Sequence, residues 1–86
     1  MFFIYILRSD RTGRFYIGQA QDVTERLRRH NSGTQRATKP GIPWRLVRQE
    51  EFTARSEAYA REREIKGKKS HKWIEWLIEQ PPVVPD

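Results

Sequence analysis

The fold is decided by residues 2–18, which read FFIYILRSDRTGRFYIG. The first six of them form an apolar run rich in aromatic and β-branched side chains, which is typical of a strand buried on both faces. Residues 9–13 supply turn-forming side chains, and residues 14–18 have the pattern of a second short strand. Two such runs joined by a turn predict a β-hairpin. On the second strand, Tyr16 and Gly18 share the face that we expect to be accessible, because Gly18 leaves a gap there.

After the hairpin, the sequence predicts a helix, a third strand and two more helices. The first helix begins at a capping box at Asp22, and residues 44–52 have the pattern of a strand. Thr53 and Ser70 are the expected N-caps of the second and third helices, and Gly67 is placed to end the second. The order ββαβαα indicates a small α+β domain with an antiparallel sheet.

The chain of 86 residues is long enough for one domain. We expect this domain to span residues 1–80 and residues 81–86 to form a flexible tail, since Pro81 and Pro82 close the last helix. No run approaches the roughly 18 apolar residues of a membrane span, and no signal peptide is expected because a basic start and a cleavage site are missing. The absence of cysteine excludes disulfides and thiolate metal sites, and it leads us to expect a cytoplasmic protein.

The charge of the chain is strongly positive. Seventeen Lys and Arg against eleven Asp and Glu leave a net charge of +6, and residues 66–72 carry four lysines and a histidine. Such a balance favours a phosphate-rich partner such as nucleic acid. A solvated basic surface without any partner explains the charge equally well, so charge alone does not decide between the two.

Two ionisable residues occupy helix positions at which the apolar periodicity predicts a core residue. His30 shares its stripe with Val23 and Leu27, and Glu62 shares its stripe with Ala58. A buried carboxylate costs several kcal/mol unless a partner compensates it, so a nearby Arg or Lys is the plain explanation for Glu62. For His30, the plain explanation is a structural histidine with satisfied hydrogen bonds.

A second interpretation joins these residues to Tyr16 and Arg26 in one site. Hydrolysis of a phosphodiester needs an activated water, positive charge on the phosphorane and help for the departing oxygen. Glu62 can hold an ion such as Mg²⁺, which keeps several waters and needs only one or two carboxylates. Arg26 can bind the phosphate through its planar guanidinium. Tyr16, on the open strand face, is within reach of a phosphate or a water.

Four segments in this order resemble the GIY-YIG nuclease family: FIY at residues 3–5, YIG at 16–18, DVTERLRRHN at 22–31 and AYAREREIKG at 58–67. They are similar to the two halves of the family signature, to its arginine helix with a trailing His-Asn, and to its metal-binding glutamate helix. The resemblance covers residues 2–78 and is closest to the small single-domain branch, which is related to the nuclease domain of the excision-repair nicking subunit. It implies the GIY-YIG fold, a three-stranded antiparallel β-sheet flanked by helices.

The same resemblance implies a metal-dependent endonuclease that hydrolyses nucleic-acid phosphodiester bonds with low sequence specificity, in DNA repair or processing. Tyr5 and Tyr16 would flank the scissile phosphate, and one of them would accept the proton of the attacking water. Arg26 would stabilise the charge of the transition state, and His30 would orient a tyrosine or relay a proton. Glu62 would ligate one divalent metal ion, Mg²⁺ or Mn²⁺.

The chain departs from the family pattern at two places. Phe3 replaces the first glycine of the signature, which is a common variation in this branch. The late asparagine that some members use near the metal is missing, because Asn31 is the only asparagine and it follows the first helix. Lys69 or Lys72 would fill that area, or the position is vacant.

The expected partner is nucleic acid, with DNA ahead of RNA, and the expected state is a monomer or a weak dimer. Two alternatives stay open. A binding module of the same fold would engage nucleic acid with little or no catalysis. An interaction protein would use Trp73 and Trp76 as a contact surface, although core packing explains these tryptophans more simply. The basic residues expected to hold the nucleic-acid backbone are Arg36, Lys39, Lys66, Lys68, Lys69 and Lys72.

Overall fold

The computed structural model describes residues 1–81. A three-stranded antiparallel sheet forms the centre of the fold. Strand β1 (Phe2–Ser9) lies between β2 (Phe15–Ala20) and β3 (Trp44–Phe52) and is antiparallel to both. The predicted hairpin is therefore the pair β1 and β2. Of the predicted tail, residues 82–86 lie outside the part of the chain that the structure describes.

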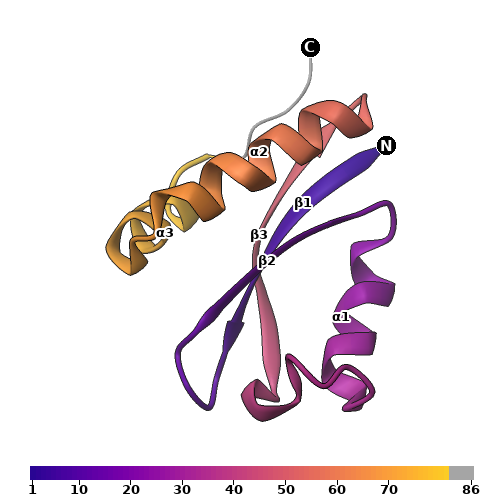
Figure 1. Cartoon of the computed structure of the whole chain (residues 1–86), viewed down its shortest axis with the longest axis vertical. Helices are drawn as coiled ribbons and strands as arrows, with labels where there is room; N and C mark the ends of the chain where they lie inside the picture. The colour runs from indigo at the N-terminus through magenta and orange to yellow at the C-terminus, as the bar shows by residue number, and fades with distance from the viewer. Residues whose placement is uncertain (82–86) are drawn as a thin grey trace.

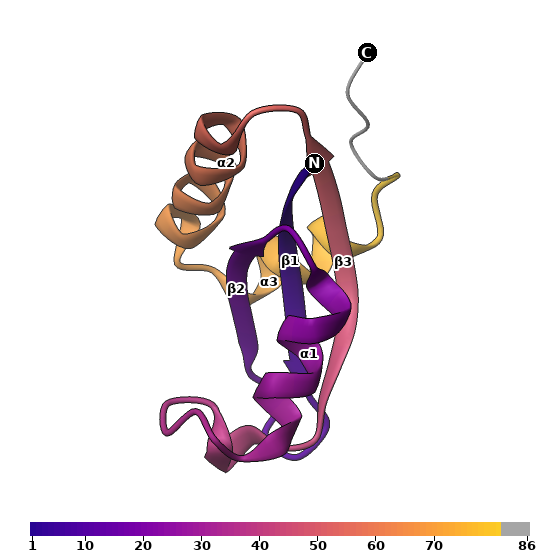
Figure 2. The same cartoon turned by 90° about the vertical axis from the view of Figure 1, so that its right-hand side faces the viewer.

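Helices cover both sides of this sheet. Helix α1 (Val23–Ser32) lies against one face, and α2 (Arg55–Lys68) and α3 (His71–Ile78) lie on the opposite side, as Figure 1 and Figure 2 show. The predicted α+β class, the order ββαβαα and the antiparallel sheet are confirmed. None of the helices described is long and apolar enough to cross a membrane.

Strand β1 is the buried centre of the fold, as its apolar run predicts. Residues 4–7 are all fully buried, none being more than 1% exposed. Alternate side chains of a strand point to opposite faces. Ile4 and Ile6 therefore join the core beneath α2 and α3, whereas Tyr5 and Leu7 join a second core beneath α1.

The N-termini of α1 and α3 are capped by the predicted residues. Asp22 accepts a hydrogen bond from Glu25 N at 3.0 Å, and Ser70 Oγ accepts one from Trp73 N at 3.1 Å. These bonds satisfy backbone donors that have no partner within the helix. The carboxylate of Glu25 pairs with Arg28 at 2.7 Å instead of reaching back to Asp22, so only half of the capping box forms.

Both predicted ends of α2 are wrong by one or two residues. The N-cap is Ala54 rather than Thr53, because the Glu57 carboxylate reaches back and accepts from Ala54 N and from Thr53 Oγ1, each at 3.1 Å. The helix also continues through Gly67. Lys69 takes the left-handed conformation that ends it, with φ 49°.

A β-bulge decides which side chains of β3 face α2 and α3. The pairing of β3 with β1 slips by one residue at Val47, and such a slip exchanges the two faces of a strand. Arg48 then lies opposite Ile6, and Glu50 lies opposite Ile4. The bulge therefore turns two charged side chains toward an apolar core.

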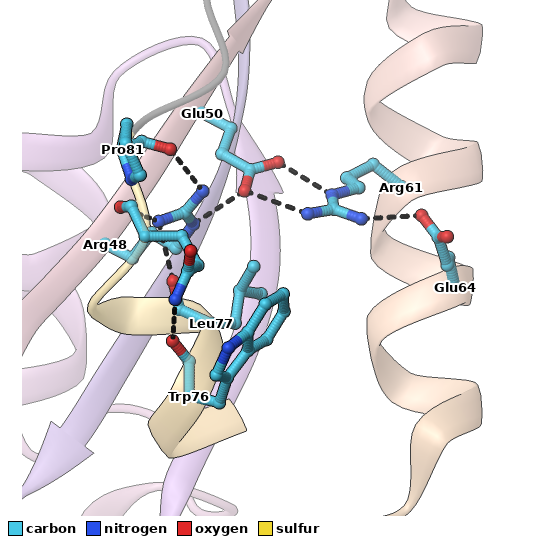
Figure 3. Close-up of polar contacts among 8 residues, drawn as sticks. Arg48, Glu50, Arg61, Glu64, Trp76, Leu77 and Pro81 are labelled. Atoms are coloured by element: carbon cyan, nitrogen blue, oxygen red, sulfur yellow. Dashed lines mark hydrogen bonds and ion pairs between the residues drawn. The ribbon is translucent and has the colours of Figure 1, made fainter. Parts of the chain in front are cut away.

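Arg48 and Glu50 form the centre of a buried ion-pair network, which Figure 3 shows. The fully buried Glu50 carboxylate accepts from Arg48 Nε at 2.6 Å and from Arg61 Nε at 2.7 Å. Arg48 also donates to the carbonyls of Leu77 at 2.8 Å and Pro81 at 3.2 Å. The network thus fastens α2 and the end of α3 to β3. Burial acts to raise the pKa of Glu50, but the hydrogen bonds and charges of the two arginines outweigh it and lower that pKa.

Candidate active site beside helix α1

Three aromatic rings gather on the α1 face of the sheet, from Tyr5 in β1, Tyr16 in β2 and His30 in α1. The ring centroids of Tyr16 and His30 are 4.5 Å apart, those of Tyr5 and His30 6.0 Å, and those of the two tyrosines 6.2 Å. Tyr16 shares the face of Tyr5 because the strand register places Tyr5 opposite Gly18, two residues further along β2. His30 faces both rings because it lies on the same buried stripe of α1 as Val23.

Gly18 does not leave the open gap that the sequence predicts. The ring of Tyr5 lies over it, so that an added Cβ would come within 2.7 Å of Tyr5 Oη and 2.8 Å of Tyr5 Cζ. The glycine therefore makes room for a side chain of the neighbouring strand and not for a ligand.

Gly18→Ala should destabilise the protein, because the new methyl group must displace the buried Tyr5 ring. Overpacking of this kind costs about 1–3 kcal/mol, which urea denaturation measures. Gly67→Ala is the matched control, since nothing lies within 4 Å of a Cβ added there. Because Gly67 lies within α2, the control should gain up to roughly 1 kcal/mol. Equal effects of the two substitutions would show that Tyr5 has room to move.

The hydroxyl of Tyr5 begins a chain of hydrogen bonds that ends at Thr38. Tyr5 Oη lies 3.1 Å from His30 Nε2, and His30 Nδ1 lies 3.1 Å from Thr38 Oγ1, with all three residues buried. Burial, and then the charge of Arg26, lowers the pKa of His30 below its ordinary value, so the imidazole is neutral at pH 7. A neutral imidazole donates from one nitrogen and accepts at the other. Because both neighbours are hydroxyl groups, either tautomer of His30 satisfies the chain.

Tyr5 is a neutral phenol in this environment. Burial, followed by the neighbouring Tyr16, raises the pKa of Tyr5 to about 12, and the negative charge of Glu62 adds to the rise. The positive charge of Arg26 acts in the opposite direction. A phenol with such a pKa is a poor general base. Arg26 and Glu62 are also near enough for their charges to act on Tyr5, so the structure gathers the other four predicted catalytic residues around it.

Glu62 has the cationic partner that its plain explanation requires. Its side chain is 15% exposed, and Lys66 Nζ lies 2.6 Å from the carboxylate. Within residues 1–81, no group of three or more His, Cys, Asp or Glu could hold a metal ion. An ion at Glu62 would therefore have at most two such protein ligands and otherwise water or substrate oxygens. That donor set fits Mg²⁺ or Mn²⁺, and it does not fit zinc, which takes three or four protein ligands.

Arg26 lines a cavity of about 180 Å³ beside the end of β2, and Arg55 lines it as well. Two guanidinium groups at one opening are suited to the oxygens of a phosphate. Sequence reasoning missed Arg55, which lies in the first turn of α2, and it missed Thr38 as the partner of His30. No spacing or motif connects either residue to the site, so only the folded chain reveals them.

The predicted backbone-binding residues are all exposed, and they lie in two places. Arg36 and Lys39 follow α1, around the short 3-10 helix η1 (Lys39–Gly41). The four lysines of residues 66–72 lie away from η1, where α2 meets α3 (Figure 1). Lys68 Nζ also lies 5.2 Å from the ring centroid of Trp73, a cation–π arrangement.

Asn31 has a structural role at the end of α1. Its side chain donates to Trp44 O at 2.9 Å and accepts from Trp44 N at 2.6 Å, which fastens α1 to the start of β3. The two tryptophans of α3 differ from each other. Trp73 packs against the core, whereas Trp76 is 53% exposed. Core packing therefore explains Trp73. It is the wrong explanation for Trp76, because that side chain is exposed.

Comparisons with known proteins show the family of the chain. A family model described as the GIY-YIG catalytic domain matches residues 1–74. The UPF0213 protein SERP0126 of Staphylococcus epidermidis is 45% identical over 65 residues, which cover 74% of this chain and 78% of that relative. The UPF0213 protein SSP2268 of Staphylococcus saprophyticus is 38% identical over 78 residues, which cover 90% of this chain and 94% of that relative. No solved structure matches the chain.

Proposed function

The chain belongs to the GIY-YIG family, a nuclease-type family, and on that premise we propose that it is a divalent-metal-dependent endonuclease that hydrolyses nucleic-acid phosphodiester bonds. The observation that carries the proposal is the grouping of Tyr16, Arg26 and Glu62 around the buried pair of Tyr5 and His30. Hydroxyl, guanidinium and carboxylate groups are what such a hydrolysis needs around one phosphate.

Arg26 is the group assigned to the scissile phosphate. Its N–H donors would bind the phosphate oxygens and neutralise the charge that grows on the phosphorane. Arg55 would add a second positive charge, because it lines the same cavity. Together they favour an anionic ligand at this end of β2.

Tyr16 is the tyrosine assigned to contact with the attacking water. It is half-buried, whereas Tyr5 is fully buried and has the raised pKa. Tyr5 and His30 are positioning residues in this scheme. The hydrogen bond between His30 and Thr38 holds the imidazole ring against the ring of Tyr16.

Glu62 is the residue assigned to the metal ion, and its surroundings fit that role. The compensating cation Lys66 is exposed, so a divalent ion can replace it without leaving a buried charge unpaired. The ion would supply a bound water of lowered pKa and positive charge for the departing oxygen.

The exposed basic residues would hold the nucleic-acid backbone. Contacts to phosphates position a strand without reading its sequence, so we expect low specificity and binding that weakens steeply with salt. The expected substrate is DNA ahead of RNA, in repair or processing, and we assign the activity to a cytoplasmic monomer or weak dimer.

A second candidate is a nucleic-acid-binding module of the same fold with little or no catalysis. The ion pair of Glu62 with Lys66 favours it. A carboxylate that a lysine already compensates can occupy its place for structural reasons alone.

Incubation of the purified chain with supercoiled plasmid tests the proposal, with Mg²⁺, with Mn²⁺ and with chelator in parallel. Nicked circles that form only with metal would support the endonuclease. Binding to branched, single-stranded or RNA ligands without cleavage would favour the second candidate. Absence of both binding and cleavage would overturn the proposed function.

A further inference from the structure

A cavity of about 340 Å³ lies on the far side of the sheet from Tyr5, where α2 meets α3. Its floor is apolar and consists of Phe15 and Ile17 from β2 with Ile65 and Ile74 from the two helices. Sites for small ligands begin at about 300 Å³. The cavity is therefore large enough for one base with its sugar.

The rim of this cavity is basic. Arg14, Lys66, Lys69 and His71 line it, and no carboxylate of the described chain does. The ring of His71 lies against that of Phe15, with the centroids 4.6 Å apart, where the floor meets the rim. An apolar floor beneath cations is complementary to a nucleotide, whose base has apolar faces and whose phosphate is anionic.

Lys69 holds a strained backbone conformation on this rim. Its φ of 49° lies in the left-handed region, which favours glycine at the end of a helix. Strained residues of this kind cluster at ligand sites, where the surrounding structure holds them in place. A lysine in this conformation lowers the stability of the fold, and a contact between the lysine and a ligand would explain why the position is not a glycine.

We propose that this cavity binds one unpaired nucleotide of the nucleic-acid strand, with the base on the apolar floor and the phosphate held by Lys69 and Arg14. The inference deepens the proposed function and rests on it, because the strand is the one that the candidate active site engages. A paired base is stacked within its duplex and cannot reach such a floor. The substrate class is therefore a single-stranded or flapped segment.

The cavity and the candidate active site are joined around one edge of the sheet. β2 is an edge strand, with Tyr16 on one face and Phe15 on the other. Lys66 lines the cavity, and its ammonium group lies 2.6 Å from the carboxylate of Glu62. A flexible strand that passes around β2 would contact both places.

Binding of dTMP to the full chain in EDTA tests the inference, followed by NMR of the isoleucine methyl groups. We expect dTMP to shift the methyl signals of Ile17, Ile65 and Ile74. Deoxyribose 5-phosphate, which lacks the base, should bind roughly tenfold more weakly. Equal shifts from inorganic phosphate and dTMP would overturn the nucleotide assignment and leave only an anion site.

The source of the nucleotide is tested with the single-stranded pentanucleotide dT5 in the same buffer. Tighter binding of dT5 than of dTMP, with the same methyl shifts, would support a strand as the source, because flanking phosphates add contacts to the lysines. Equal affinities for dT5 and dTMP would overturn the proposal that the nucleotide belongs to a strand, and would assign the cavity to a free nucleotide.

Lys69→Gly separates binding from folding. The variant should melt several degrees higher, because glycine adopts the left-handed conformation without strain. Its affinity for dTMP should fall roughly tenfold, because a charge-assisted contact is lost. Arg63→Ala is the matched control, since this exposed residue of α2 does not line the cavity, and it should bind dTMP as the wild type does.

Wild-type affinity in Lys69→Gly would overturn the inference. The binding assay contains no metal, and the methyl shifts of Ile17, Ile65 and Ile74 report on this cavity. If the chain nicks plasmid but does not bind dTMP, only the inference about this cavity is overturned. If the chain binds dTMP but never nicks plasmid, only the proposed endonuclease activity is overturned.

Discussion

Glu62→Gln should lower metal-dependent plasmid nicking roughly a thousandfold, since a metal ion contributes several kcal/mol to the transition state and about 1.4 kcal/mol is a factor of ten. The substitution keeps the size of the side chain and removes the charge that holds a divalent ion. Folding should change little, because Lys66 is exposed and such an ion pair is worth at most about 1 kcal/mol. Initial rates of nicking at saturating Mn²⁺ measure the effect.

Glu64→Gln is the matched control for this substitution. Glu64 lies on the same helix, is 53% exposed and pairs with Arg61 at 2.7 Å, so its loss should leave nicking unchanged. A second measurement is the rise in melting temperature on addition of Mn²⁺, which reports binding to the folded chain. We expect the rise in the wild type and in Glu64→Gln but not in Glu62→Gln. Undiminished nicking by Glu62→Gln would remove Glu62 from the metal site.

Glu50→Ala should destabilise the protein by about 3–5 kcal/mol, because removing one partner of a buried ion pair leaves the other charge uncompensated. The main cost is the unpaired charge of Arg48, because its side chain is only 4% exposed and Glu50 is its acidic partner. A loss of this size is comparable to the whole stability of a small domain. Urea denaturation followed by circular dichroism should therefore find the variant largely unfolded at 37 °C.

The control for Glu50 is again Glu64→Gln, which removes the exposed partner of Arg61 and leaves the buried one. It should cost less than about 1 kcal/mol. Similar losses in the two variants would mean that burial of Glu50 does not decide the effect.

The lowered pKa of Glu50 also predicts how stability depends on pH. The folded protein binds the proton less readily than the unfolded chain does, so the contribution of this carboxylate is complete above the unfolded pKa of about 4.3. It is lost as the pH falls through the folded pKa, so the free energy of unfolding should decrease below about pH 4. Glu25, whose pKa Arg28 and Arg29 lower to about 2, acts in the same direction. The free energy of unfolding should therefore be measured against pH on Glu25→Gln. A decrease below about pH 4 that persists in this variant is assigned to the buried network of Glu50. Absence of that decrease would contradict the prediction.

The sequence by itself determined the features that depend on near neighbours. The apolar run at residues 2–7 could only become a buried central strand, because both of its faces are hydrophobic. Asp22 and Ser70 cap helices because a cap acts on an amide three residues away. Helical periodicity likewise assigned His30 and Glu62 to the inner sides of their helices, and the motifs at matching spacing indicated the family. The roles of the candidate site residues stay predictions.

Only the tertiary structure decided which of these side chains meet. The bulge at Val47 exchanges the faces of β3, and a one-residue slip leaves no mark on local periodicity. The contact of Glu50 with Arg61 joins residues 11 positions apart, and that of His30 with Thr38 joins residues 8 apart across a loop. The ring of Tyr5 fills the space above Gly18 for the same reason, as strand pairing brings the two residues together. The secondary structure follows from interactions between residues close in sequence. The contact partners of each side chain follow from how the helices and strands pack together.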